Sequence, residues 1–308
     1  MSDQGEIAPL FLEERRTKNT IVLHRLKRVL YSGRTRYQRV DVVELFDYGL
    51  GLVLDGQIQS TAADEWIYHE TLVHPALVTH PRPVDALLIG GGEGATAREI
   101  LRHNTVKSLT MIDIDQEVIE LCKRLLSSFH QGSFDNPRLR LVIGDGRAVL
   151  DAQPDNSLDV IVVDATDPIE GGPAALLYTR EFYEIVKRKL RGDGVIVTQA
   201  TSTFYSADCY ASVYRTIKSV FGNAHAYYVW VPSFLSAWGF VLATRRGSPR
   251  ELGEEEVRKR LEERGVSGLR FYSPELHRTL FIIPAYLNEV LEKRGRIVSD
   301  DSPVFIPI

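Results

Sequence analysis

The chain has 308 residues, of which 44% are hydrophobic and 25% charged, and its formal net charge at pH 7 is −4. These values indicate a globular protein of one large or two modest domains, and the mild negative charge argues against a nucleic-acid partner. Its two cysteines form no C-x-x-C pair, and we find no signal peptide and no apolar run of membrane-spanning length, so we expect a cytoplasmic protein with no membrane partner.

The first 75 residues predict a small N-terminal antiparallel β domain that ends in a linking helix. Residues 1–18 are polar, and we expect them to be loosely held. From Ile21 to Thr61, short β-like stretches are broken by Ser-Gly, Tyr-Gly and Asp-Gly, which favours hairpins. A helix is predicted from Asp64 to Val78. Because such a β unit has little core of its own, we expect it to pack on a neighbour or a second subunit.

Residues 76–308 predict an α/β domain in which strands and helices alternate. Five parallel strands are predicted, at Ala86–Ile89, Leu109–Asp113, Leu139–Ile143, Leu158–Asp164 and Gly194–Gln199. Helices are predicted at Ala95–His103, Gln116–Ser127, from Arg147, at Thr179–Leu190 and at Ala207–Val220.

Two further strands, Ala226–Val231 and Trp238–Thr244, are joined by so short a connection that they must pair antiparallel. This ending is typical of the seven-stranded, methyltransferase-like (Rossmann-type) sheet and not of the dinucleotide-binding type. After Ser248 we expect only a charged helix, an apolar segment and a last helix that runs through Arg294.

The first parallel strand is followed by the turn Gly90-Gly91-Gly92-Glu93-Gly94 and then by a helix, which is the start of a nucleotide-binding unit. Spacing alone fits both the dinucleotide and the S-adenosyl pattern. The carboxylate of Glu93 would repel a pyrophosphate, whereas it suits an ammonium or a sulfonium. The alternative is a solvated glutamate on a loop tip.

Acids and one amide stand at the carboxyl ends of the other parallel strands, where open α/β sheets bind ligands. They are Asp113, Asp145, Asp164 with Asp167, and Gln199. Each acid alone could simply cap the next helix. Together they indicate a crevice in which Asp113 accepts ribose hydroxyls, Asp145 meets an adenine amino group, and the pair Asp164 and Asp167 receives a cation and accepts a proton.

Several motifs resemble those of the polyamine aminopropyltransferases, the spermidine synthase family. They are Leu54-Asp55-Gly56, Gln59, Asp64-Glu65, Tyr68-His69-Glu70, G-G-G-E-G, G-D-G and D-x-x-D-P, in this order between about Tyr37 and Thr244. The resemblance implies a homodimer or homotetramer that moves the aminopropyl group of decarboxylated S-adenosylmethionine to an amine. It also implies release of methylthioadenosine, with no metal and no other cofactor.

The resemblance also implies roles for residues at matching positions. It makes Asp164 the catalytic proton acceptor and Asp167 a residue that holds the acceptor amine. The other substrate-binding residues that we expect are Gln38, Asp113, Asp145 and Gly146 at the nucleoside, Tyr68, His69 and Glu93 around the aminopropyl and amine channel, and Gln199. Trp230 and Trp238 are candidates for lining the channel, although packing is the simpler use of each.

The chain departs from many spermidine synthases at the acceptor end. It has Glu93 where they have aspartate, Phe234 where they have tyrosine, and Thr201 where they carry an acid. With these differences, and with motifs such as D-P-I-E-G-G-P, the chain resembles thermospermine synthases and the triamine and agmatine branch of the family. The favoured acceptor is therefore spermidine, and agmatine, putrescine and norspermidine stay open. An S-adenosylmethionine-dependent amine N-methyltransferase, an NAD dehydrogenase and a non-enzymatic sensor are the less favoured readings.

Overall fold

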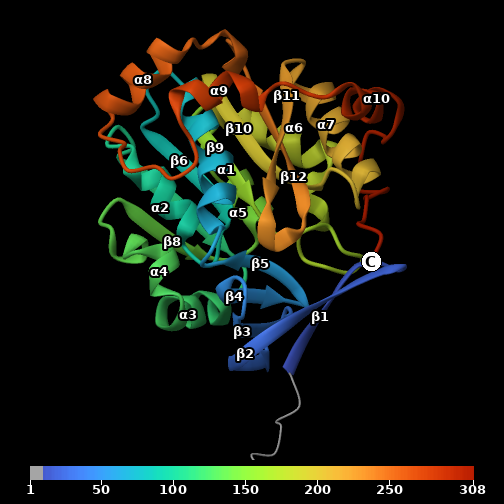
Figure 1. The fold of residues 1–308 in the computed structure, drawn as a ribbon. Coiled ribbons are helices and arrows are strands. Elements are labelled where there is room, and N and C mark those ends of the chain that lie inside the picture. The colour runs from blue at the N-terminus through green and yellow to red at the C-terminus, as the bar shows by residue number, and fades with distance from the viewer. Residues whose placement is uncertain (1–9) are drawn as a thin grey trace, which may run out of the picture.

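Residues 10–308 of the computed structural model are described, and they form two sheets joined by a helix (Figure 1). The N-terminal sheet is antiparallel, with its strands in sequence order. Its strands are β1 (Leu10–Thr17), β2 (Thr20–Arg34), β3 (Arg39–Leu45), β4 (Gly49–Leu54) and β5 (Gln57–Thr61). The helix α1 (Glu65–Thr79) then leads into the second sheet.

Strand β1 shows that the expectation of a loosely held segment was wrong for residues 10–17; residues 1–9 lie outside the described part of the chain. β1 pairs with β2 along its length. Its Glu14 is buried, and the carboxylate contacts the guanidinium of Arg16 at 2.8 Å and the imidazole of His24 at 2.7 Å. Because these inward-facing polar groups pair with one another, the strand has no apolar alternation by which the sequence could have revealed it.

The second sheet has seven strands in the order β11-β12-β10-β9-β6-β7-β8, which confirms the predicted fold class. The parallel strands are β6 (Asp85–Gly90), β7 (Ser108–Asp113), β8 (Leu139–Ile143), β9 (Leu158–Asp164) and β10 (Leu190–Ser202). At one edge, β12 (Ser236–Thr244) runs antiparallel to β10 and to β11 (Ala224–Val231). Strand β10 is longer at both ends than the sequence predicts.

Helices cover both faces of this sheet, so its central strands are apolar on both sides. The helices after α1 are α2 (Ala95–Arg102), α3 (Gln116–Leu125), α4 (Ser127–His130), α5 (Gly146–Asp151), α6 (Arg180–Lys189), α7 (Ala207–Phe221), α8 (Glu254–Glu263), α9 (Pro274–Leu280) and α10 (Ala285–Lys293). One core cluster joins the sheet to α1, α2 and α8, and the other joins it to α6, α7 and α10. A third cluster packs α3 and α4 on the N-terminal sheet.

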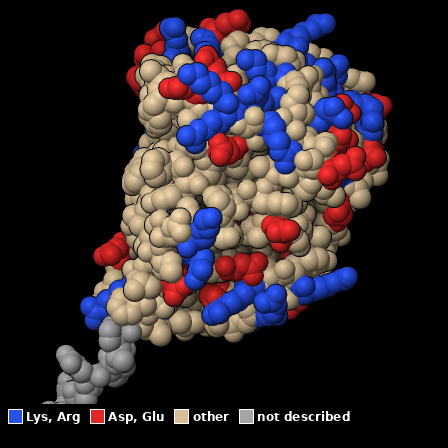
Figure 2. All heavy atoms as spheres, turned by 90° about the vertical axis from the view of Figure 1, so that its right-hand side faces the viewer, with Lys and Arg blue, Asp and Glu red and all other residues tan. Residues whose placement is uncertain are grey.

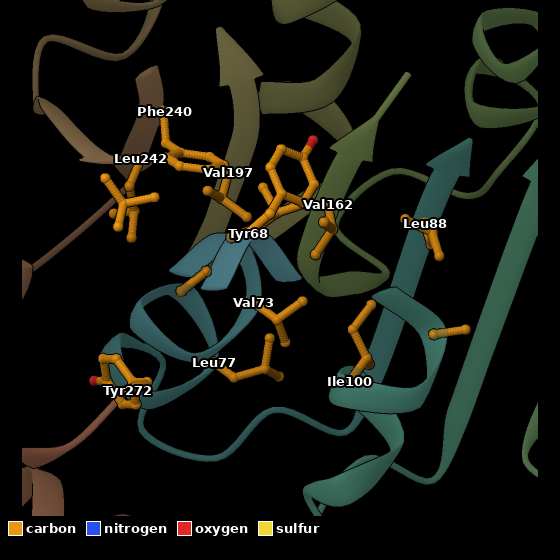
Figure 3. Packing of buried hydrophobic residues seen from close by; sticks show 14 of the residues in the cluster. Tyr68, Val73, Leu77, Leu88, Ile100, Val162, Val197, Phe240, Leu242 and Tyr272 are labelled. Atoms are coloured by element: carbon orange, nitrogen blue, oxygen red, sulfur yellow. The ribbon is translucent and has the colours of Figure 1, made fainter. Parts of the chain in front are cut away.

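Helix α1 is buried along most of its length, and its side chains pack on the seven-stranded sheet. Figure 3 shows Val73 and Leu77 on this helix, with Val162 of β9 and Val197 of β10 in the same cluster. The tyrosine Tyr68 lies near the start of the helix, next to the carboxyl ends of the strands. The helix therefore carries its first turns to the edge where ligands are expected.

The chain after β12 returns to both parts of the molecule. The guanidinium of Arg264 donates to the carbonyls of Leu77, His80 and Pro81 at the end of α1. The last residues then reach back to the N-terminal sheet, where the Lys18 amide donates to the Pro307 carbonyl at 3.3 Å.

On the face shown in Figure 2, charged side chains of both signs gather toward the two ends and leave a largely uncharged band between them. Of the helices within residues 10–308, none has the length and apolar character needed to cross a membrane.

Candidate active site

A deep cavity lies at the carboxyl ends of the parallel strands, between the seven-stranded sheet and the N-terminal sheet. The predicted site residues all line it: Gln38, Tyr68, His69, Glu93, Asp113, Asp145, Gly146, Asp164, Asp167 and Gln199. The structure thus brings together residues from the loop before β3, from α1, from the glycine turn and from the ends of four strands. Their contacts differ, and these contacts determine what each can do.

The glycine turn allows the backbone to approach two acids. Gly90 has φ +82° and pairs with Asp164 across the sheet, and a Cβ at Gly90 would lie 2.2 Å from the Asp164 carbonyl oxygen. A Cβ at Gly92 would lie 3.0 Å from Oδ2 of Asp113. Any side chain at Gly90 would collide with β9, and one at Gly92 would press on Asp113. The turn is therefore packed against the backbone of Asp164 and the carboxylate of Asp113.

Asp164 is the last residue of β9, and each of its carboxylate oxygens accepts one hydrogen bond. The Tyr68 hydroxyl donates to Oδ1 at 2.7 Å, and the Thr96 hydroxyl donates to Oδ2 at 2.5 Å. A carboxylate has about four lone-pair sites. Two donors from α1 and α2 therefore fix the orientation of Asp164 and leave it free to accept a proton from a group in the cavity.

Asp167 lies beyond β9, and the amide of Gln199 holds it in place. Nε2 of Gln199 donates to Asp167 Oδ1 at 3.1 Å, while its Oε1 accepts the Thr201 amide at 2.8 Å and the indole N–H of Trp238 at 3.2 Å. Burial raises the pKa of Asp167 to about 7 and outweighs the hydrogen bond from Gln199. Trp238 lines the cavity, whereas Trp230 is 56% exposed and does not.

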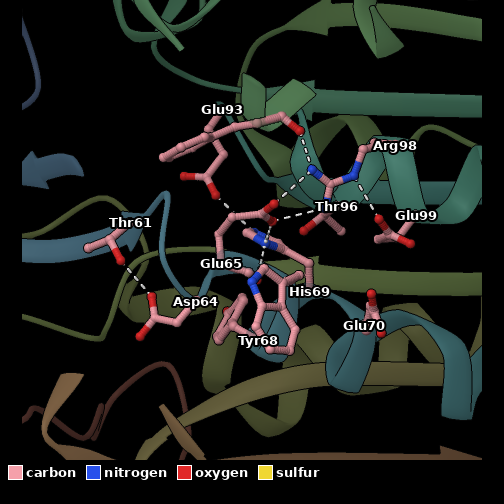
Figure 4. A network of polar contacts seen from close by, with 12 residues as sticks. Thr61, Asp64, Glu65, Tyr68, His69, Glu70, Glu93, Thr96, Arg98 and Glu99 are labelled. Atoms are coloured by element: carbon pink, nitrogen blue, oxygen red, sulfur yellow. Dashed lines mark hydrogen bonds and ion pairs between the residues drawn. The ribbon is translucent and has the colours of Figure 1, made fainter. Parts of the chain in front are cut away.

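Glu93 is only 7% exposed, so it is not a solvated loop tip. One of its oxygens lies 2.8 Å from Nε2 of His69 (Figure 4). Nδ1 of His69 contacts the Glu65 carboxylate at 2.9 Å, and Glu65 in turn accepts two hydrogen bonds from Arg98, at 3.0 and 2.9 Å. Glu93 is therefore held at the cavity by a buried chain of alternating charges.

The pKa values along this chain follow from burial and pairing. Burial alone would lower the pKa of His69, but its hydrogen bonds to Glu65 and Glu93 outweigh it and raise that pKa to about 10. Burial raises the pKa of Glu93, and the bond to His69 opposes this. At neutral pH His69 is thus an imidazolium, and it fixes the direction in which the Glu93 carboxyl group faces.

The other end of the cavity holds Asp113, Asp145 and Gln38. Asp113 accepts the Asp115 amide at 2.9 Å, and burial raises its pKa to about 7. The Asp145 carboxylate accepts the Ala148 amide at 2.8 Å and so caps α5 as well as lining the cavity. Gln38 donates to Asp115 at 3.1 Å, which leaves its amide oxygen without a partner within the described residues.

The sequence did not reveal three parts of the cavity wall. Arg16 of β1, Arg147 of α5 and the C-terminal residues Ile306 and Ile308 also line it. The inward alternation of Glu14 and Arg16 on one strand was the only signal for the first. No periodicity or motif marked Ile306 and Ile308, because the end of the chain has no regular secondary structure.

Within the described residues, no group of three or more His, Cys, Asp and Glu side chains is placed to hold a metal ion.

Two family models match the chain. Residues 65–250 match the "Spermine/spermidine synthase domain", and residues 10–62 match the "Spermidine synthase tetramerisation domain". The first match contains most of the cavity, and the second contains the N-terminal sheet.

Relatives and solved structures match over nearly the whole chain. A polyamine aminopropyltransferase of Sulfurisphaera tokodaii is 46% identical over 92% of this chain and 94% of its own length. The polyamine aminopropyltransferase 2 of Pseudomonas aeruginosa is 42% identical over 92% of this chain and 82% of its own length. A crystal structure of a spermidine synthase in complex with the transition-state analogue AdoDATO has a TM-score of 0.87 and 32% identity, covering 94% of this chain and 98% of that one.

Proposed function

Since this chain belongs to the spermine/spermidine synthase family and has that family's aminopropyltransferase activity, we propose that its acceptor is spermidine and its product thermospermine. The aminopropyl donor in this proposal is decarboxylated S-adenosylmethionine, and the other product is 5'-methylthioadenosine. Agmatine, putrescine and norspermidine are the alternative acceptors. The same transfer chemistry serves all four.

The observation that carries the proposal is the density of acids in one cavity. Glu93, Asp113, Asp145, Asp164 and Asp167 all line it. Two cationic guests, a sulfonium and a protonated amine, explain why so many carboxyl groups share a site, since like charges crowded together are otherwise unfavourable. The buried Glu93 in the glycine turn opposes a phosphate in that position.

In the proposed mechanism Asp164 accepts the proton of the attacking nitrogen. A polyamine nitrogen has a pKa of about 10 and is mostly protonated at pH 7, so it cannot attack until it gives up a proton. Its lone pair then forms a bond to the aminopropyl carbon beside the sulfonium, and the carbon–sulfur bond breaks. The electron pair stays on sulfur, which becomes a neutral thioether, so this step requires neither a metal nor another cofactor.

The proposed division of the cavity follows the contacts. Asp113, Asp145, Gly146 and Gln38 would bind the nucleoside, whereas Asp167 would hold the acceptor amine. His69, Tyr68 and Gln199 would orient the acids around the reacting groups. Phe234, which also lines the cavity, is apolar where many spermidine synthases have a tyrosine. This difference supports an acceptor with a longer carbon chain.

Incubation with decarboxylated S-adenosylmethionine and each of spermidine, agmatine, putrescine and norspermidine tests the acceptor. We expect methylthioadenosine with all productive amines and the highest kcat/KM with spermidine. Release with none of them would contradict the function. Incubation with S-adenosylmethionine separates the alternative of an N-methyltransferase, because the carboxylate of that donor would face Glu93 and Asp164.

Asp164→Asn tests the proposed proton acceptor. We expect kcat to fall by about 10²- to 10⁴-fold, the usual contribution of a positioned base, while methylthioadenosine binding measured by calorimetry is unchanged. Asp135→Asn is the matched control, because Asp135 is exposed and does not line the cavity. Full turnover by Asp164→Asn would remove Asp164 from the mechanism.

We also propose a homodimer or homotetramer built through the N-terminal sheet, as the tetramerisation-domain match suggests. Leu10, Phe11, Ile21 and Leu23 on β1 and β2 are exposed large apolar side chains, which a subunit contact would cover. Light scattering of the full chain measures the assembly. The cytoplasmic location, the absence of nucleic-acid and membrane partners, and the division at residues 75 and 76 stay predictions.

A further inference from the structure

The end of the chain supplies a wall of the cavity that the family match does not account for. The match to the synthase domain ends at residue 250, yet Ile306 and Ile308 line the cavity. Ile306 is buried, with 9% of its surface exposed. We call residues 298–308 the C-terminal strap.

The first part of the strap is anchored to the outer helices of the seven-stranded sheet. The Arg180 amide at the start of α6 donates to the Val298 carbonyl at 2.8 Å. Asp300 accepts a bidentate ion pair from Arg147 of α5, at 2.8 and 2.7 Å, and its amide donates to Glu181 at 3.0 Å. A bidentate guanidinium–carboxylate pair fixes direction as well as distance, so the strap leaves α5 and α6 along a defined path.

The second part of the strap is anchored on both sides of the cavity. The Ile306 amide donates to the Pro168 carbonyl at 2.9 Å, and the Pro307 carbonyl accepts the Lys18 amide at 3.3 Å. Pro168 belongs to the loop after β9, and Lys18 belongs to the turn between β1 and β2. The strap therefore connects the seven-stranded sheet to the N-terminal sheet, and the two connecting hydrogen bonds are made by Ile306 and by Pro307, the residue after it.

The strap begins near Arg147, two residues after Asp145, and the anchors of its second part place Ile306 at the other end of the cavity. Pro168 follows Asp167 directly, and Lys18 is close in the chain to Arg16, and both Asp167 and Arg16 line the cavity. Asp113, by contrast, ends β7 and Asp145 follows β8, and both strands lie on the other side of β6 from β9 and β10. Under the proposed function, on which this inference rests, the strap bounds the end where the acceptor amine lies.

The chemistry of this wall favours methylene groups over charge. The side chains of Ile306 and Ile308 offer no acceptor to an ammonium group, and the nearby guanidinium of Arg16 would repel one. An ammonium pressed against this wall would lose water without gaining a partner. We propose that the C-terminal strap, through Ile306 and Ile308, sets how far an acceptor amine can extend beyond Asp167 and so selects acceptors by length.

Ile306→Ala, alone and with Ile308→Ala, tests the proposal on putrescine, norspermidine, spermidine and spermine. We expect the ratio of kcat/KM for the longest to that for the shortest acceptor to rise about tenfold, since a single methylene in an apolar pocket changes discrimination by that order. The KM for the nucleoside donor stays the same. Ile297→Ala is the matched control, because Ile297 is 49% exposed and does not line the cavity.

Calorimetric titration of each amine into the enzyme saturated with methylthioadenosine separates this inference from the proposed function. A wild type that turns over no amine refutes the function, whereas the binding ratio of long to short amines still tests the strap. If Ile306→Ala does not fold, Ile306→Val makes the same test with one carbon removed. An acceptor ranking that is unchanged within about twofold in a folded variant would overturn the proposal.

Discussion

Tyr68 joins the core to the cavity within one side chain. Its ring packs edge-on against Phe234, with centroids 5.9 Å apart, and lies tilted against Phe240 at 5.4 Å, while its hydroxyl donates to Asp164 at 2.7 Å. Burial raises the pKa of the hydroxyl well above its usual value, so Tyr68 is a neutral donor around neutral pH. The ring and the hydroxyl can therefore be tested separately.

We predict that Tyr68→Phe lowers kcat by about tenfold or more and lowers the melting temperature by a few degrees. The substitution keeps the ring contacts but removes a hydrogen bond to a charged group, which is worth about 1.5–3 kcal/mol. Steady-state kinetics and thermal unfolding measure the two effects. Tyr228→Phe, on β11 and away from the cavity, is the control, and an unchanged kcat in Tyr68→Phe would contradict the orienting role of the hydroxyl.

Under the proposed function, Asp167 would give amine binding a dependence on pH. Its pKa is raised to about 7 by burial, so the empty site loses this negative charge as the pH falls below neutrality. Polyamines, with pKa values of about 10, stay protonated between pH 5.5 and 8. We predict that the calorimetric Kd of the amine, in the presence of methylthioadenosine, rises as the pH falls through this range.

The variant Asp167→Asn has no carboxyl group at this position, so we expect a weaker amine affinity with a shallower dependence on pH. Asp135→Asn is again the control and keeps the slope of the wild type. An unchanged slope in Asp167→Asn would assign the titration to another acid in the cavity, of which Asp113, with a pKa also raised to about 7, is the first candidate.

At the scale of elements, α1 is held in place by the chain that follows the seven-stranded sheet. Glu70, next to His69 on this helix, accepts the backbone amides of Phe271 and Tyr272, each at 2.8 Å, and that of Arg270 at 2.9 Å. The carboxylate thus fastens an irregular loop to the helix that carries Tyr68. The loop has no regular hydrogen bonds of its own, so these amides depend on one side chain.

We predict that Glu70→Gln destabilises the protein by about 1–3 kcal/mol, because the neutral amide is a weaker acceptor and one of its ends is a donor. Glu70 does not line the cavity, so kcat of the folded variant changes little. Urea unfolding measures the loss, and Glu255→Gln on the exposed side of α8 is the control. Equal stability of the two variants would show that the loop is held by its apolar contacts alone.

For the whole molecule, the parts that the sequence predicted are those in which pattern and position coincide. The strands that end in Asp113 and Asp164 are mainly apolar on both faces and stop at an acid, so their buried character and the position of these acids at the cavity could be predicted. The family itself was recognisable from motifs in the same region, and the comparisons confirm it. The preference for spermidine as acceptor stays a prediction.

The parts that could not be predicted are those set by long-range contact. Arg16 faces the cavity from a strand whose buried charges hide its pattern, and Ile306 belongs to a segment that is ordered only by its bonds to Pro168 and Lys18. Neither local propensity nor spacing encodes such contacts. The same holds for the Glu65–His69–Glu93 chain, in which only the turn residue was singled out for its charge.

Two separate sets of segments build the two ends of the cavity, so each end can change during evolution without the other. Under the proposed function, the ends of β7 and β8 supply the groups that bind the donor, whereas β1 and the strap contribute a wall at the other end. After gene duplication, substitutions at Arg16 or Ile306 could therefore change which amine is accepted, while the donor-binding end of the cavity stays the same. Acceptor preference would then change by few steps and would not track overall sequence similarity.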